Sequence, residues 1–407
     1  MGTIDKEKQR KTRSWLKVLG PGIITAALVF GPSKMTITSK LGATYGYDLL
    51  WAVVAAIFFM AVFTSMASRI ALATDQSFLA LIKERWGKPV AVLVGIGVFF
   101  VTASFQAGNS TGVGIALAET TGVSTRVWII LANALGIALL FFKGFYKILE
   151  KIMIVLIVVM LGSFIVTFFL AKPPAGSIIK GLAPALPEGS LGLVIALFAS
   201  AFSIVGALYQ SYMVQERRRL SPGLQQKPSD SLPGILILGV MASIVLICAA
   251  SILHPAGVVV TNATDMSKTL APLFGQYAAH LFLVGLFGAS FSSLIGNASV
   301  GGTLLGDALG YKGQLSSNTV RILIGLVMVI GAFVALRFDK APLELIVLAQ
   351  SVTILVVPFI GIAMFIIAND RHIMGGYVNK PATKVAAGIG LLMLLALAVI
   401  NVKELFF

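Results

Sequence analysis

The amino-acid sequence predicts an all-α integral membrane protein. Of its 407 residues, 57% are hydrophobic and 12% are charged, and the mean hydropathy is +0.96. These values lie outside the range of ordinary soluble domains. Apolar runs long enough to cross a bilayer recur along the whole chain, separated by short polar segments. The pattern predicts a bundle of about eleven membrane-spanning helices.

The expected spans follow one another with short connections. A basic tail, residues 1–17, precedes them and is too charged to be a signal peptide. Hydropathy places the spans at residues 18–44, 48–72, 90–117, 126–142, 150–171, 190–214, 232–253, 274–305, 319–336, 343–368 and 384–402. The polar segment 216–230 divides six spans from five. We therefore expect residues 18–407 to form a single transmembrane domain.

The basic residues predict how this domain is oriented. If the N-terminus is cytoplasmic, 21 of the 31 Lys and Arg residues fall on the cytoplasmic side and seven on the other. Cytoplasmic loops of membrane proteins are enriched in positive charge. We expect a multi-pass protein of the cell (inner) membrane with a cytoplasmic N-terminus and, because the span count is odd, an extracellular or periplasmic C-terminus. The net charge of +15 follows from this bias, so it indicates contact with membrane lipid and no nucleic-acid partner.

The sequence offers little for enzyme chemistry. The single cysteine, Cys248, excludes a disulfide framework and a thiolate metal cluster. All 16 acidic residues and all three histidines fall in loops or at span ends. We find no Ser/His/Asp set, no phosphate loop and no pair of acids at membrane depth. The sequence therefore predicts a protein that is not an enzyme, with no cofactor and no residues that ligate a metal.

Two of the expected spans contain features that interrupt a helix. Gly31-Pro32-Ser33 lies near the middle of the first span, where the proline removes a backbone donor and clashes with the preceding turn. Lys34 follows directly, as a cation at membrane depth. In the sixth span the corresponding weak points are Ser203 and Gly206, without a proline. Broken helices of this kind mark the substrate site of transporters built from inverted repeats.

Several separated motifs resemble the Nramp family of metal-ion transporters, which share the LeuT-type fold. The matching segments are Gly20-Pro21-Gly22, Gly42 to Trp51, Thr111-Gly112 with Ile115-Ala116-Leu117, Met213 to Arg217, Leu348-Ala349-Gln350, Val356 to Phe359 and Asn369 to Gly375. The resemblance implies an inverted repeat of five plus five helices with one extra helix. Repeat one would span about 18–171, repeat two about 190–368, and the eleventh helix about 384–402.

The positions that match the family's metal site carry different residues. Gly31-Pro32-Ser33-Lys34 stands where the family has Asp-Pro-Gly-Asn, and Ser203-Ile204-Val205 stands where it has Met-Pro-His. A second histidine of the sixth span falls on Gln210. Gln106 and Asn109 replace an aspartate and a glutamate that serve proton movement, whereas Gln350 matches a glutamine near the metal. The resemblance therefore implies a kept scaffold and an altered site.

Lys34 has a structural and a functional interpretation. In the structural one, its ammonium bonds to carbonyls freed by the two helix breaks. In the functional one, it attracts a small anion or loads and releases a proton in each cycle. A divalent ion about 4 Å from a charged lysine would be repelled by roughly 8 kcal/mol at an effective dielectric constant near 20. This repulsion argues against metal transport. Bicarbonate is the leading anion, because it is small and singly charged and both donates and accepts hydrogen bonds, which suits a small site of hydroxyls and amides; nitrate or formate follow closely.

The candidate residues fall into two sets. The expected substrate-binding residues are Gly31, Ser33, Lys34, Ser203, Val205, Gly206, Tyr209, Gln210 and Gln350. The expected polar path consists of Gln106, Asn109, Ser293 and Asn297. Such polar side chains also form ordinary hydrogen bonds between membrane helices, so a packing role is the competing interpretation of the path.

Three functions are compatible with these observations. The favoured one is an Nramp-like secondary-active transporter that works by alternating access on a small anion, bicarbonate first, with proton coupling as a further option. The second is a divalent metal cation transporter for manganese, iron or magnesium, as in the family that the chain resembles. The third is a non-transporting receptor or scaffold. The expected partners are a small solute or ion and membrane lipid, and the oligomeric state is left open.

Overall fold

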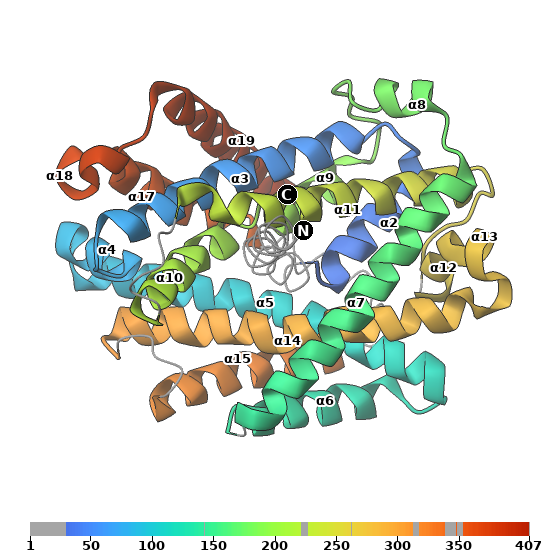
Figure 1. Ribbon diagram of the computed structural model, residues 1–407, viewed down its shortest axis with the longest axis horizontal. Coiled ribbons are helices and arrows are strands. Elements are labelled where there is room, and N and C mark those ends of the chain that lie inside the picture. The colour runs from blue at the N-terminus through green and yellow to red at the C-terminus, as the bar shows by residue number, and fades with distance from the viewer. Residues whose placement is uncertain are drawn as a thin grey trace, which may run out of the picture.

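Every regular element that the computed structural model describes is a helix (Figure 1). The structure describes residues 30–141, 143–220, 227–261, 263–311, 317–337, 347 and 353–406. The first half of the first expected span and Gln350 lie outside these residues.

Within the described residues, helices lie in each of the expected spans, although only the second half of the first span and part of the tenth are described. These helices are α2 (Pro32–Tyr45), α3 (Leu50–Ala73), α5 (Lys88–Thr121), α6 (Thr125–Leu139), α7 (Lys143–Ala171), α9 (Leu191–Phe202), α10 (Ile204–Leu220), α11 (Leu232–Ile252), α14 (Ala278–Leu309), α15 (Asn318–Arg337), α17 (Val357–Asn369) and α19 (Pro381–Phe406). Shorter connecting helices are α4 (Phe78–Trp86), α8 (Ala175–Lys180), α12 (Ala263–Ser267), α13 (Ala271–Phe274) and α18 (Arg371–Met374). Single turns of 3-10 helix occur at Pro228–Ser231, Lys268–Leu270, Gly275–Tyr277 and Gly375–Tyr377.

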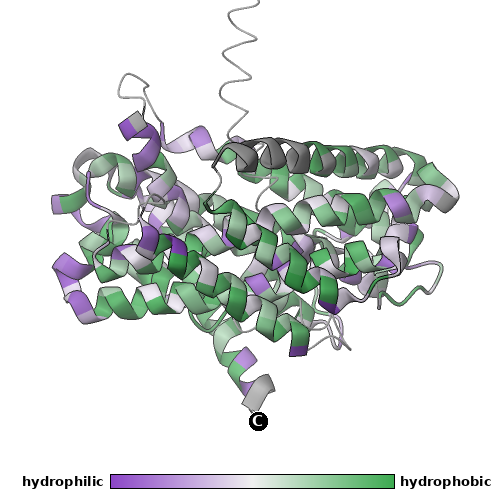
Figure 2. Ribbon diagram, turned by 90° about the horizontal axis from the view of Figure 1, so that it is seen from below, coloured by the Kyte–Doolittle hydropathy of each residue, from purple (hydrophilic) through white to green (hydrophobic). Residues whose placement is uncertain are grey.

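The helices have the length and composition of membrane spans. Within the described residues, seven are long and apolar enough to cross a bilayer, with α9 and α10 taken together as one of them. The chain also bends by 67° between α17 and the segment Arg371–Tyr377. Figure 2 shows hydrophobic residues along most of the helices and hydrophilic residues gathered mainly toward their ends. A multi-pass membrane protein is the architecture that this distribution requires.

The helices pack around the pair α5 and α14, which run side by side through the middle of the molecule (Figure 1). α15 lies along both members of the pair, and α6 packs against α5 and α15. α2 lies against α11, and the approach is close. A Cβ atom on Gly42 would lie 2.3 Å from the carbonyl oxygen of Leu246. Small residues are what allow membrane helices to approach in this way.

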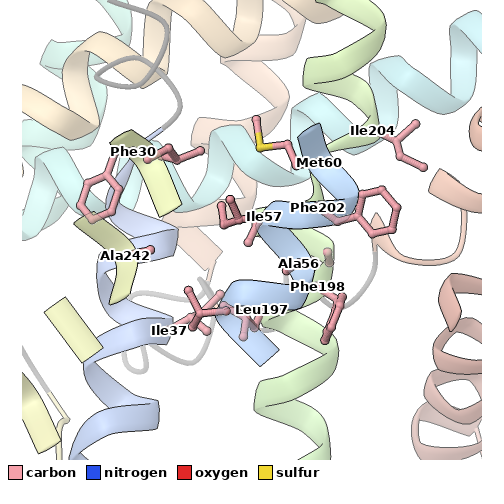
Figure 3. Close-up of a cluster of buried hydrophobic side chains, with 14 of the residues drawn as sticks. Phe30, Ile37, Ala56, Ile57, Met60, Leu197, Phe198, Phe202, Ile204 and Ala242 are labelled. Atoms are coloured by element: carbon pink, nitrogen blue, oxygen red, sulfur yellow. The ribbon is translucent and has the colours of Figure 1, made fainter. Parts of the chain in front are cut away.

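A hydrophobic cluster surrounds the junction between α9 and α10. Figure 3 shows Phe202 and Ile204, on either side of that junction, among side chains of α3 that include Met60. The ring of Phe202 is fully buried. It stacks on Phe59 at 5.5 Å between ring centroids and meets Phe63 edge-on at 5.1 Å. Aromatic packing against α3 therefore holds the end of α9 next to the break.

Polar contacts tie helices together at one end of the molecule, where α4, α18 and the end of α10 gather (Figure 1). Arg85 of α4 forms an ion pair with Asp370, just before α18. Arg218 of α10 forms an ion pair with Asp75, with 3.1 Å between Nη1 and Oδ1. The opposite end carries α8, α12 and α13. The basic residues of α4, α10 and α18 thus share one end of the molecule.

Candidate functional site

The sixth span is broken at Ser203, one of the two weak points that the sequence predicts. Ser203 adopts a left-handed conformation, with φ 41° and ψ 57°, between the end of α9 and the start of α10. A residue with a Cβ atom rarely takes this conformation without tertiary support. The other weak point, Gly206, lies under the Ser203 side chain, because a Cβ atom there would be 2.6 Å from the Ser203 hydroxyl oxygen. The break leaves carbonyl groups in the last turn of α9 without their usual helical donors.

Lys34 of α2 meets one of these carbonyl groups. Its Nζ atom donates a hydrogen bond of 2.7 Å to the carbonyl oxygen of Ser200, in the last turn of α9. The Lys34 side chain is only 5% exposed. The C-terminal end of a helix carries partial negative charge, so a cation at this position is stabilised. The geometry is that of the structural interpretation, in which the ammonium bonds to a carbonyl freed by the break.

The start of α2 is enclosed by α5 and α14. Gly31 precedes Pro32, the first residue of the helix. A Cβ atom on Gly31 would lie 2.8 Å from the Ser293 hydroxyl oxygen and 3.6 Å from the Asn109 side-chain oxygen. Gly31, Asn109 and Ser293, from both expected sets, are therefore brought together. Ser33, the next residue along α2, is also buried.

A second contact at this junction was not predicted from the sequence. A Cβ atom on Gly112 of α5 would lie 2.4 Å from the Ser290 hydroxyl oxygen and 2.8 Å from Cβ of Pro32. α2, α5 and α14 therefore meet at the proline itself. The small residues in α5 and α14 indicate that helices pack closely there. The sequence does not show which of the small residues face Pro32.

The polar residues of α5 separate into different environments. Ser110 and Asn133 of α6 are hydrogen-bonded, with the Asn133 amide nitrogen donating to the Ser110 hydroxyl over 3.0 Å. This pair matches the packing interpretation. Gln106 is fully buried, and neither of its amide atoms has a hydrogen-bond partner within the described part of the chain. It lies against α15, because a Cβ atom on Gly331 would be 2.5 Å from its side chain. Gln106 and Asn109 thus face different neighbours.

The remaining candidates lie in α14 and α10. Asn297 donates a hydrogen bond of 2.7 Å to the carbonyl oxygen of Thr102, so it links α14 to α5 as a packing residue. Val205 is buried among apolar side chains. Tyr209 and Gln210 are half-buried, one to two turns beyond the break.

The candidate residues of this region carry neutral oxygen atoms and one cation. In the described part of the chain, no group of three or more His, Cys, Asp or Glu side chains is arranged to hold a metal ion. Among the residues whose exposure the structure describes, Lys34 is the one charged residue that is buried. Oxygen ligands for an ion are available from Ser203, Asn109, Ser293 and the last-turn carbonyls of α9.

Comparisons with known proteins place this arrangement in a family. The family model described as natural resistance-associated macrophage protein-like matches residues 22–404. The divalent metal cation transporter MntH of Chromohalobacter salexigens is 26% identical over 97% of this chain and 92% of its own length. The protein of the same name from Deinococcus radiodurans is 24% identical over 95% and 90%.

Solved structures agree on the fold. The manganese transporter of Eremococcus coleocola, in complex with an aromatic bis-isothiourea substituted compound, has a TM-score of 0.73 at 19% identity, covering 96% of this chain and 87% of that one. Mhp1, a nucleobase-cation-symport-1 family transporter, has a TM-score of 0.63 at 14% identity, covering 94% and 92%. These matches confirm the predicted all-helical LeuT-type architecture.

The expectation of a small-anion substrate, bicarbonate first, is wrong. The relatives that align over nearly their whole length are divalent metal cation transporters. The structure supplies the physical reason for the error. The charge of Lys34 is directed at the Ser200 carbonyl oxygen at the negative end of α9, so it is not an unengaged cation waiting for an anion.

Proposed function

The chain belongs to the Nramp family, and we propose that it carries a divalent metal cation across the membrane by alternating access, as a secondary-active transporter. The observation that carries this proposal is the near full-length match to relatives named as divalent metal cation transporters. The family consists of transporters and not of enzymes, and transport requires a solute or ion as substrate.

The break at Ser203 and the start of α2 at Pro32 support a site between α2, α9 and α10. Discontinuous helices provide free backbone groups at membrane depth, where they can coordinate an ion. The break at Ser203 and the start of α2 at Pro32 are joined through the contact between Lys34 and Ser200. The substrate would bind at this junction and reach it past Asn109 and the α14 serines.

The ligand chemistry favours a hard cation that keeps part of its water shell. Hydroxyl, amide and carbonyl oxygens suit Mg²⁺ and Mn²⁺, whereas soft thiolate or thioether ligands suit other metals. Mg²⁺ in particular is bound by few protein ligands and several waters. Of manganese, iron and magnesium, we therefore rank Mn²⁺ and Mg²⁺ first.

The test is metal uptake by the purified protein in liposomes. We expect saturable Mn²⁺ uptake that excess Mg²⁺ inhibits and that empty liposomes do not show. Asn109→Leu should lower the uptake at least tenfold, because it removes an oxygen ligand beside the start of α2. Ser163→Ala is the matched control, since Ser163 bonds only to the Val159 carbonyl of its own helix in the described contacts. Absence of Mn²⁺, Fe²⁺ and Mg²⁺ uptake by the wild-type protein would refute the proposal.

We also infer that the N-terminus is cytoplasmic and the C-terminus lies outside. The support is the bias of basic residues and their gathering at the end that carries α4, α10 and α18. Cys248 is buried, so single cysteines can be introduced for labelling. In right-side-out vesicles, Lys403→Cys should react with a membrane-impermeant maleimide and Lys6→Cys should not. The opposite labelling pattern would reverse the orientation.

A further inference from the structure

We propose that Lys34 is a specificity-determining residue whose ammonium group occupies the cation site of the empty transporter, so that a transported cation must displace it. This inference rests on the proposed metal transport and deepens it. In this role the Lys34 ammonium group competes with the metal ion for the same carbonyl oxygen.

The first support is where the ammonium group lies. It is bound by the Ser200 carbonyl oxygen at 2.7 Å, in the last turn of α9 before the break at Ser203. Carbonyl oxygens at the C-terminal end of a broken helix are the groups that coordinate cations in transporters of this architecture. The lysine therefore uses one of the ligands that a transported cation needs.

The second support is the connection that the ammonium group makes. Lys34 belongs to α2 and Ser200 to α9, so the hydrogen bond joins two spans 166 residues apart in sequence. An ion bound between two broken helices makes the same kind of connection. Here the Lys34 side chain makes this connection.

The third support is the surrounding charge. Lys34 is buried, and none of the acidic side chains whose exposure the structure describes is buried with it. With few negative groups nearby, the site cannot hold the ammonium group and a divalent cation together. Binding of the metal therefore requires the ammonium to leave the Ser200 carbonyl.

The test compares variants that keep or remove the charge. Lys34→Met has a similar length without charge. Lys34→Gln is also neutral but can still donate to the Ser200 carbonyl, which protects against a loss of folding. Lys34→Arg keeps the charge. We expect both neutral variants to bind Mn²⁺ at least tenfold more tightly than the wild type in calorimetric titrations, and Lys34→Arg to bind no more tightly.

Thermal melting gives a second measurement of the same competition. Mn²⁺ should raise the melting temperature of Lys34→Met and Lys34→Gln by more than it raises that of the wild type. Unchanged or weaker Mn²⁺ binding in both folded neutral variants would overturn the proposal.

Wild-type uptake separates this proposal from the proposed function. If the wild type transports Mn²⁺ and the neutral variants bind no tighter, only the role of Lys34 is wrong. If the wild type transports no metal but the neutral variants bind Mn²⁺, the role of Lys34 holds and the transported substrate is wrong. If neither is seen, both are wrong.

Discussion

Replacing Gly112 with alanine tests the three-helix junction without altering any polar group. The new Cβ atom would lie 2.4 Å from the Ser290 hydroxyl oxygen, 2.8 Å from Cβ of Pro32 and 3.0 Å from Cγ of Pro32. The serine hydroxyl can rotate away. The proline ring cannot, so the start of α2 has to move relative to α5.

The expected loss of stability follows from two opposing effects. Adding a methylene-sized group to a packed interior costs about 1–3 kcal/mol. Alanine in place of glycine inside a helix gains about 1 kcal/mol. Because a rigid ring is one of the two obstacles, we expect the cost in the upper half of its range and a net destabilisation of about 1–2 kcal/mol.

A matched control comes from Gly162, in the middle of α7. A Cβ atom there would meet nothing within 4 Å, so Gly162→Ala should be neutral or stabilise by up to about 1 kcal/mol through helix propensity alone. The free energy of unfolding of both variants is measured by denaturant titration in detergent. Adding Ser290→Ala to Gly112→Ala should recover part of the loss, because it removes the nearer contact.

Uptake provides the functional side of the same experiment. Movement at Pro32 displaces the neighbouring residues of the site, so Gly112→Ala should slow Mn²⁺ uptake while Gly162→Ala leaves it unchanged. The reasoning is refuted if Gly112→Ala is as stable as Gly162→Ala and transports at the wild-type rate, since α2 would then not meet α5 at this glycine.

Three further predictions concern contacts away from the site. The hydrogen bond from Arg85 lowers the pKa of Asp370. The pair therefore stabilises the fold above the unfolded pKa, near 3.9, and this stabilisation is lost as the pH falls through the pKa of Asp370 in the folded protein. The free energy of unfolding should fall more steeply with acid for the wild type than for Asp370→Asn. Tyr212 donates to a carboxylate oxygen of Asp307 over 2.7 Å, so Tyr212→Phe should destabilise by about 1.5–3 kcal/mol in denaturant unfolding. Asn133→Ala removes a bond between α5 and α6 and should cost about 1 kcal/mol without changing the Mn²⁺ affinity measured by titration.

The sequence predicted the spans because hydropathy acts over some twenty residues and averages out local error. Wherever the structure describes residues of the expected spans, long helices lie there. The start of α2 at Pro32 was evident from the sequence, because a proline cannot continue a helix. The break in the sixth span was harder to predict, because Ser203 carries no such constraint. Its left-handed conformation depends on the packing of Phe202 and its neighbours, which belong to distant segments.

The site was predicted less completely, for a related reason. Gly31, Asn109 and Ser293 do meet, whereas Gln106 and Asn297 serve other contacts. The partner of Lys34 is a backbone carbonyl, and every residue has one, so no side-chain pattern marks it. The sequence shows that a lysine lies at membrane depth, but it does not show which group binds its ammonium. That gap produced the mistaken inference of an anion.

The same contact makes a lysine compatible with the proposed cation transport. A divalent ion and an ammonium group about 4 Å apart would repel each other by roughly 8 kcal/mol at an effective dielectric constant near 20. That energy forbids simultaneous occupancy, but it does not oppose exchange, in which one cation replaces the other on the carbonyl. Because the Ser200 carbonyl keeps a cationic partner at each stage, α9 is not left with an unsatisfied carbonyl in the membrane interior. A lysine at this position therefore raises the threshold for metal binding, and it leaves the cation site itself in place.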